Sequence, residues 1–149
     1  MTTRADQTIL LVEDSPEDYE VTVRAFRKAN LLNPVFRCQD GEEALDYLYR
    51  RGRYVDPTSA PRPGLVLLDL NLPGTDGRQV LAQIKSDAQL RTIPVIVLTT
   101  SADERDIESC YRSGANSYVQ KPVSLDAFLR SVQLLKSYWF EVAILPRSA

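Results

Sequence analysis

The chain has 149 residues, of which 44% are hydrophobic and 26% are charged, and its formal net charge is −2. This length suits a single domain, and the near-average composition argues against disorder over most of the chain. The small negative charge also argues against a protein whose main affinity is for nucleic-acid phosphates.

Short apolar runs alternate with longer amphipathic segments from the start of the chain. The first run, residues 9–12, predicts a strand, and the Ser15-Pro16 pair after it offers a capping side chain followed by a residue already fixed at a helical φ angle. Apolar residues then recur at helical spacing as far as Ala29, which predicts the first helix. A second strand is predicted at residues 35–38.

The rest of the chain continues this alternation. The Asp-Gly-Glu-Glu sequence at residues 40–43 resembles a capping box at the start of the second helix. Residues 50–64 are rich in arginine, proline and glycine, and we expect them to form an exposed loop. Further strands are predicted at residues 65–68, 95–98 and 117–119, and further helices around residues 80–84, 106–112 and 125–135.

Five strands alternating with five helices predict an α/β fold whose doubly wound parallel sheet is covered by helices on both faces. In such folds, ligands gather at the carboxyl ends of the strands. Four predicted strand ends carry polar residues suited to a ligand site, namely Glu13 with Asp14, Asp69, Thr99 and Lys121. Each of them alone has an ordinary explanation as a helix start, a strand end or a solvated charge, but their joint occurrence indicates a site.

The residue types at these strand ends favour a magnesium ion. Three carboxylates close together repel one another unless a cation is bound, and Lys121 could neutralise an incoming anion. The chain has no histidine, so the commonest general base and zinc ligand are missing, and oxygen ligands suit hard cations. The two cysteines, Cys38 and Cys110, are interpreted as buried thiols and not as a disulfide framework.

Nothing in the sequence indicates export or membrane insertion. Residues 1–7 are polar and lack the apolar stretch of a secretory signal, and no apolar run approaches the ~20 residues needed to span a bilayer. We therefore expect a cytoplasmic protein with a polar N-terminal tail at residues 1–7, one domain at residues 8–143 and a C-terminal tail at residues 144–149.

Over roughly residues 8–143 the chain resembles a response-regulator receiver domain. The resemblance is carried by the stretches ILLVEDSPED, LVLLDLNLPGTDGRQVLAQIK, IPVIVLTTS and SGANSYVQKP, and by the spacing from Asp69 to Thr99 to Lys121. It implies a flavodoxin-like fold with strand order 2-1-3-4-5. It also implies a single-domain response regulator of a two-component phosphorelay, phosphorylated by a histidine kinase, whose only chemistry is its own phosphorylation and dephosphorylation.

The resemblance implies a role at each matching position. Asp69 matches the phosphoacceptor, Thr99 matches the hydroxyl that bonds the phosphoryl group, and Lys121 matches the cation that pairs with it. Tyr118 matches the aromatic switch that turns inward when the threonine moves.

The same resemblance implies a magnesium site and a special peptide bond. Asp14 matches a direct ligand of Mg²⁺, Glu13 matches the neighbouring acid, and Asp69 itself contributes to the site. Asn71 matches the position that gives a backbone carbonyl to the metal. The peptide bond before Pro122 is expected to be cis, as is typical of the family.

Few residues follow the last predicted helix, so we expect a stand-alone receiver whose output is contact with another protein, so far unidentified, or with itself. The 50–64 loop, the stretch DLNLPGTDGR and the tail SYWFEVAILP are similar to the small regulators paired with bacterial and cyanobacterial phytochromes. This similarity implies a phytochrome-type kinase as the phosphodonor. It also implies a homodimer formed through the fourth and fifth helices and the tail.

The tail leaves two interpretations open. Its apolar residues either fold back on the sheet of the same chain or form an interface with a partner or a second copy. These residues are Tyr138, Trp139, Phe140, Val142, Ile144 and Leu145.

Other functions on the same fold are less favoured by the residues. A pseudo-receiver that acts as a phosphorylation-independent adaptor would not need the acid pair, Asp69, Thr99 and Lys121. A phosphatase of the haloacid-dehalogenase type needs a second acid two residues after the first, whereas this chain has Asn71 there. A flavodoxin-like cofactor carrier needs a phosphate-binding loop after the first strand, and none is present.

Overall fold

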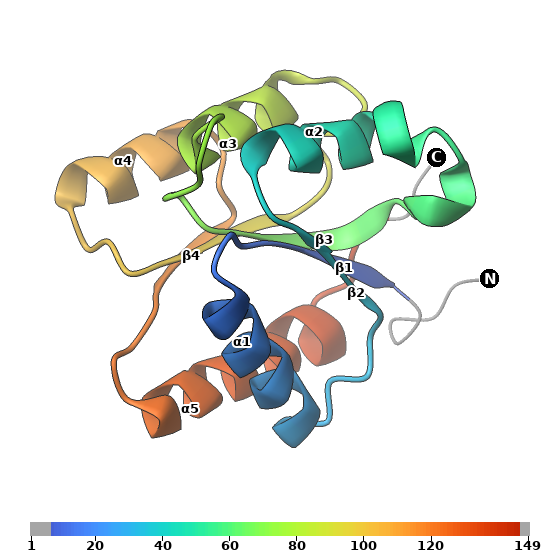
Figure 1. The fold of residues 1–149 in the computed structure, drawn as a ribbon. Helices are drawn as coiled ribbons and strands as arrows, with labels where there is room; N and C mark the ends of the chain where they lie inside the picture. Colours follow the sequence, from blue (N-terminus) through green and yellow to red (C-terminus); the bar gives the residue numbers. More distant parts are fainter. Residues whose placement is uncertain (1–6, 147–149) are drawn as a thin grey trace.

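The computed structural model describes residues 7–146 and contains a five-stranded sheet flanked by helices (Figure 1). All neighbouring strands are parallel, and their order is β2-β1-β3-β4-β5, so the predicted fold class and strand order are confirmed. The strands are β1 (Thr8–Val12), β2 (Val35–Cys38), β3 (Pro63–Leu68), β4 (Val95–Thr99) and β5 (Ser117–Gln120). The α-helices are α1 (Pro16–Lys28), α2 (Gly41–Tyr49), α3 (Gly77–Ser86), α4 (Glu104–Arg112) and α5 (Leu125–Lys136).

The helices lie in two layers, with α2, α3 and α4 on one face of the sheet and α1 and α5 on the other (Figure 1). Alternate residues of each central strand face the two layers, so Leu10 and Val66 belong to the core under α2 to α4, while Ile9 and Leu65 belong to the core over α1 and α5. Both faces of β1, β3 and β4 are therefore buried, which explains why these strands are unbroken apolar runs.

Side-chain caps fix where the helices begin. The Ser15 hydroxyl accepts the backbone N–H of Asp18 at the start of α1, as predicted. The capping box expected at residues 40–43 forms only in half: Asp40 accepts the N–H of Glu43, but the Glu43 carboxylate accepts the N–H of Gln39 and not that of Asp40. A complete capping box closes the start of α3 instead, between Asp76 and Gln79.

The segment at residues 50–64 departs from the exposed loop that we expected. It forms two short 3₁₀ turns, and the side chains of Tyr54 and Ala60 are buried within it. The Tyr54 ring packs edge-on against Tyr47, with 5.2 Å between ring centroids, and its hydroxyl donates to Glu43 at 2.7 Å. The expectation was wrong for these residues because an aromatic side chain within reach of the core gains more from burial than the loop loses in freedom.

The interpretation that the apolar residues of the tail fold back on the sheet of the same chain is confirmed for Phe140 and Leu145, while the interface stays a prediction. A π-helical turn at Ser137–Val142 follows α5, and Phe140 and Leu145 are buried in the core over α1 and α5. Packing on the sheet thus continues past residue 143. Tyr138, Val142 and Ile144 are 54%, 69% and 84% exposed.

Three further expectations concern the ends, the membrane and the thiols. Of the predicted N-terminal tail, only Gln7 falls within the described residues, and of the predicted C-terminal tail only 144–146 do. In residues 7–146, no helix has both the length and the apolar character needed to cross a membrane. Cys38 and Cys110 are buried and unpaired, as predicted.

Candidate functional site

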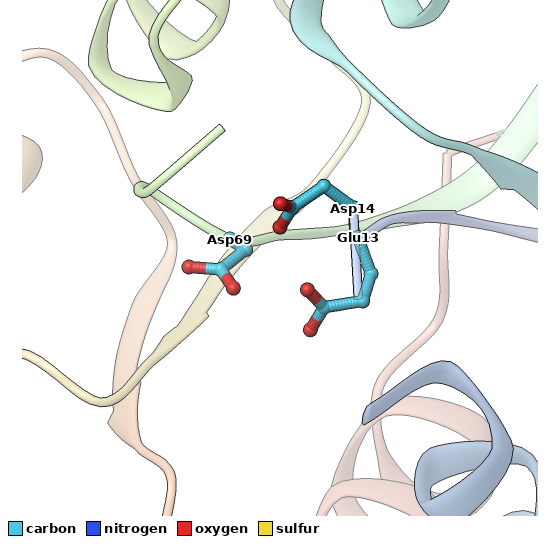
Figure 2. A group of neighbouring side chains, drawn as sticks. All are labelled: Glu13, Asp14 and Asp69. Carbon is cyan, nitrogen blue, oxygen red and sulfur yellow. The ribbon is translucent and has the colours of Figure 1, made fainter. Parts of the chain in front are cut away.

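The ends of β1 and β3 bring three carboxylates together. Val12 pairs with Leu68 in the sheet, and the Asp69 N–H donates to the Val12 carbonyl at 3.1 Å, so the residues that follow the two strands are neighbours. Glu13, Asp14 and Asp69 each offer a carboxylate oxygen within 4.8 Å of the other two. Figure 2 shows the three carboxylates gathered on one side of the strand ends. Glu13 and Asp69 are buried, and Asp14 is exposed.

Lys121 reaches this cluster from the end of β5. Its ammonium group donates to Glu13 Oε1 at 2.5 Å and to Asp69 Oδ2 at 3.1 Å, and lies 3.5 Å from Asp18 Oδ2. Its backbone N–H donates to the Thr99 carbonyl at 2.7 Å, which ties the β5 end to the β4 end. Burial opposes the charge of Lys121, but the hydrogen bond to Glu13 and the two carboxylate charges outweigh it and raise the lysine's pKa.

For the pKa of Glu13, burial has a larger effect than the hydrogen bond from Lys121. It raises the pKa of this carboxyl group despite the opposing hydrogen bond from Lys121, and the nearby charge of Asp69 acts in the same direction. Three carboxylates face one ammonium group in this cluster, so a bound cation would offset the remaining negative charge.

Thr99 lies at the end of β4 with its side chain fully buried. Its hydroxyl has no hydrogen-bond partner among the described residues. A buried hydroxyl without a partner costs free energy, and such groups in native structures call for an explanation. Because β4 is the neighbour of β3, the strand that precedes Asp69, the Thr99 hydroxyl at the end of β4 is suited to donate to a group attached to the Asp69 carboxylate.

Asn71 and Gly77 shape the segment after Asp69. The Asn71 backbone N–H donates to Asp69 Oδ1 at 3.1 Å, while the predicted role of its carbonyl as a metal ligand stays a prediction. The start of α3 packs so closely on the end of β3 that a Cβ atom at Gly77 would lie 2.2 Å from the Asp69 carbonyl oxygen. Only glycine fits this contact, because it has no Cβ atom.

Tyr118 already faces inward. Its hydroxyl donates to the Ser101 carbonyl at 2.9 Å, and its partly buried ring packs against the core under α2 to α4.

The prediction of a cis peptide bond before Pro122 was wrong, because the Lys121–Pro122 peptide bond is trans. Trans is the intrinsically favoured isomer even before proline, by about 0.5–1 kcal/mol, and the backbone bond from Lys121 to Thr99 forms with it.

Two residues at the site were not found from the sequence. The Arg37 side chain donates to the carbonyls of Glu13 and Asp14, at 3.1 and 3.2 Å, and its guanidinium lies over the Tyr19 ring. Asp18 is the third carboxylate near Lys121. Neither gave a signal, because Arg37 lies inside a short strand and Asp18 belongs to the acidic first turn of α1, where an acid is expected for helix stability.

The donor set fits a hard divalent cation. All three side chains of the acidic cluster offer oxygen, two of them are largely shielded from water, and no nitrogen or sulfur ligand belongs to the cluster. Oxygen-only sets of this kind suit Mg²⁺ or Mn²⁺ rather than zinc.

Comparison with known proteins gives consistent matches over nearly all of the chain. The family model of the response regulator receiver domain matches residues 9–133. The response regulator Rcp1 of Synechocystis sp. is 40% identical over 140 residues, which span 94% of this chain and 93% of Rcp1.

Solved structures agree with this match. The Mn²⁺-bound form of Rcp1 has a TM-score of 0.87 at 40% identity, and the phosphorylated cyanobacterial phytochrome response regulator RcpA has a TM-score of 0.88 at 41% identity. RPA3017, a response regulator in red light signaling of R. palustris, has a TM-score of 0.90 at 35% identity. Each comparison covers 95% of this chain and 99% of the other.

Proposed function

Because the chain belongs to the family of response regulator receiver domains, we propose that Asp69 accepts a phosphoryl group from a sensor histidine kinase and that this switches a protein-interaction surface. The observation that carries the proposal is the geometry around Asp69. Its carboxylate accepts a hydrogen bond from the Lys121 ammonium group and lies close to the carboxylates of Glu13 and Asp14. The Thr99 hydroxyl, which has no partner among the described residues, lies at the same edge of the sheet.

The transfer needs little covalent chemistry from the protein. An Asp69 carboxylate oxygen forms the new bond to phosphorus, and the bond from phosphorus to the imidazole nitrogen of the kinase histidine breaks, with its electron pair leaving on that nitrogen. Lys121, already 3.1 Å from Asp69, offsets the charge on the transferred oxygens. The Thr99 hydroxyl, which has no partner among residues 7–146, would donate to one of these oxygens.

Glu13, Asp14, Asp69 and the Asn71 carbonyl would hold the cation, which we propose to be Mg²⁺. When bound, it supplies positive charge that neutralises the transferring phosphoryl oxygens. The oxygen-only cluster supports this assignment, and so does the Mn²⁺-bound form of the related Rcp1. Since the chemistry centres on one side chain, we propose that the protein turns over no separate substrate and only gains and loses its own phosphoryl group.

The partners follow from the relatives. RcpA is a phytochrome response regulator and RPA3017 acts in red light signaling, which supports a phytochrome-type kinase as the phosphodonor. We further propose a homodimer through α4, α5 and the tail, supported by the exposed apolar side chains of Leu134, Tyr138 and Val142. The downstream partner would be a protein that distinguishes the two phosphorylation states of this surface.

Intact-protein mass spectrometry after incubation with acetyl phosphate tests the acceptor. A gain of one phosphoryl group that requires Mg²⁺ and disappears in Asp69→Asn is the expected result. A gain that survives in Asp69→Asn would mean that another residue is the acceptor. If acetyl phosphate gives no gain, the same assay with a phytochrome-type kinase follows, and no gain there either would favour a phosphorylation-independent adaptor.

A further inference from the structure

A forked ion pair joins α3 to α4 beside the proposed acceptor site. Arg78, the second residue of α3, donates from Nε and Nη2 to the two carboxylate oxygens of Asp106 on α4, each at 2.8 Å. Its Nη1 also donates to both oxygens of Asp76, at 3.0 and 3.1 Å. Two parallel bonds of this kind fix geometry as well as charge. The Arg78 and Asp106 side chains are only 35% and 20% exposed, so water screens the pair less than an ordinary surface pair.

From Asp106, hydrogen bonds lead to the predicted switch residue. The Ser101 hydroxyl donates to Asp106 Oδ2 at 2.8 Å, and the Ser101 carbonyl accepts the Tyr118 hydroxyl at 2.9 Å. Ser101 lies two residues beyond Thr99, in the segment that joins β4 to α4. The Arg78 guanidinium therefore helps to hold, through Asp106, the residue that accepts the Tyr118 hydroxyl.

In the other direction, Arg78 is connected through the backbone of Gly77 to the segment that follows β3. Its neighbour Gly77 donates its backbone N–H to the Leu70 carbonyl at 3.0 Å and approaches the Asp69 backbone too closely for any side chain. The start of α3 thus cannot shift independently of the Asp69–Leu70 backbone. The Arg78 side chain thus links the segment that holds Tyr118 to the start of α3, and the Gly77 backbone links that start to the backbone beside Asp69.

We propose that Arg78 is a positioning residue that couples phosphorylation of Asp69 to the α4–β5 surface, by holding Asp106 and Ser101 where Ser101 accepts the Tyr118 hydroxyl. This rests on the proposed function, because it assumes that Asp69 is the acceptor. Arg78 touches neither Asp69 nor the transferred group, so its loss should weaken the response of the surface without removing the acceptor chemistry.

The test combines intact-mass labelling with hydrogen exchange on the full-length protein, with and without acetyl phosphate and Mg²⁺. Exchange is followed in peptides that cover residues 98–107 and 117–121. In Arg78→Gln we expect labelling of Asp69 to the wild-type extent, several-fold faster exchange around Ser101 before labelling, and loss of more than about half of the change that labelling causes in wild type.

Matched variants separate positioning from a general loss of an ion pair. Arg112→Gln removes an arginine–carboxylate pair that lies entirely on α4, with Glu108, and should leave the labelling response as in wild type. Arg78→Lys keeps the charge but not the two-pronged geometry, so an intermediate response is expected. Asp106→Asn should reproduce Arg78→Gln, and the double variant should add little to either single change because both break one link.

The outcomes distinguish this inference from the proposed function. A wild-type response to labelling in Arg78→Gln would overturn the coupling role. If wild-type protein accepts no phosphoryl group from acetyl phosphate or a kinase, the proposed function fails, and the unlabelled exchange data alone then decide the positioning. In that case, faster exchange around Ser101 in Arg78→Gln but not in Arg112→Gln would support it, and unchanged exchange would overturn it.

Discussion

At the scale of single residues, the buried hydroxyl of Thr99 calls for an explanation. This hydroxyl is fully buried and has no partner among residues 7–146, whereas Asp69 and Lys121 beside it are paired. An unsatisfied buried hydroxyl destabilises a fold by about 1–3 kcal/mol, and the natural explanation is a group that binds there only part of the time. Under the proposed function, that group is the phosphoryl group on Asp69.

Replacing Thr99 with valine tests this cost directly. Valine keeps the shape and removes the hydroxyl, so Thr99→Val should raise the free energy of unfolding of the unphosphorylated protein by about 1 kcal/mol, or leave it unchanged. Urea unfolding would measure the change. The same variant should still be labelled on Asp69 but should lose the response of the α4–β5 surface. A loss of more than about 1 kcal/mol would show that the hydroxyl has a stabilising partner in the native protein.

At the scale of elements, the packing of α3 on the end of β3 depends on a glycine, Gly77. A Cβ atom at Gly77 would meet the Asp69 carbonyl oxygen at 2.2 Å and the Leu70 Cα at 2.6 Å, and both are backbone atoms that cannot turn away. Gly77→Ala should therefore lower the free energy of unfolding by about 3 kcal/mol, measured by urea denaturation.

Gly74→Ala is the control for this change. Gly74 has a φ angle of +66° but open space around its Cβ position, so its replacement brings only backbone strain, about 1 kcal/mol. Equal losses in the two variants would mean that α3 can move away from Asp69 at little cost.

The link between α3 and α4 predicts a pH dependence of stability. The hydrogen bonds from Arg78, and then that from Ser101, lower the pKa of Asp106 from its ordinary value of 3.8. A carboxyl group whose pKa is lower in the folded state stabilises the fold above its unfolded pKa, and this contribution is lost as the pH falls through the folded pKa. Asp106→Asn should therefore cost about 1 kcal/mol at pH 7, and the difference from wild type should vanish progressively below pH 3.8.

Urea unfolding of both proteins between neutral and acidic pH would measure this. Glu108→Gln removes an exposed pair on the same helix and should cost little at any pH. A difference between wild type and Asp106→Asn that stays constant as the pH falls would contradict ionisation of Asp106 as its origin.

At the scale of the whole molecule, the acidic cluster links metal binding to global stability. A cation that binds only the folded state stabilises it by about 2.7 kcal/mol at a concentration 100 times its dissociation constant. Thermal unfolding in MgCl₂ should therefore occur several degrees higher than in EDTA at matched ionic strength. Asp14→Asn removes an exposed member of the cluster and should abolish most of the shift. An equal shift in wild type and Asp14→Asn would indicate that the metal binds elsewhere.

The assembly of the protein is the second prediction at this scale. Leu134, Tyr138, Val142 and Ile144 are all more than half exposed near the end of α5 and the turn that follows it. Such apolar surface favours association, so sedimentation at high concentration should give the mass of a dimer. Leu134→Glu should weaken the dimerisation. A strictly monomeric mass at high concentration, with and without labelling by acetyl phosphate, would exclude the proposed homodimer.

The amino-acid sequence alone determined most of the architecture and pointed to the candidate site residues. Apolar periodicity and caps depend on neighbouring residues, so the five strands and the starts of α1, α2 and α5 could be predicted, whereas α3 and α4 begin before the helices predicted around residues 80–84 and 106–112. The rule that ligands collect at the carboxyl ends of parallel strands then pointed to Glu13, Asp14, Asp69, Thr99 and Lys121, and the structure brings the three acids and Lys121 into direct contact.

The tertiary structure decided what depends on contacts between distant segments. The burial of Tyr54, the link from Arg78 to Asp106 and the unpartnered Thr99 hydroxyl all arise from packing between elements that no local pattern encodes. The trans peptide bond before Pro122 and the exposure of part of the tail likewise could not be predicted from local patterns. The physical reason is that a side chain's partners are chosen by the shape of the whole core, whereas its helix or strand is chosen largely by its neighbours along the chain.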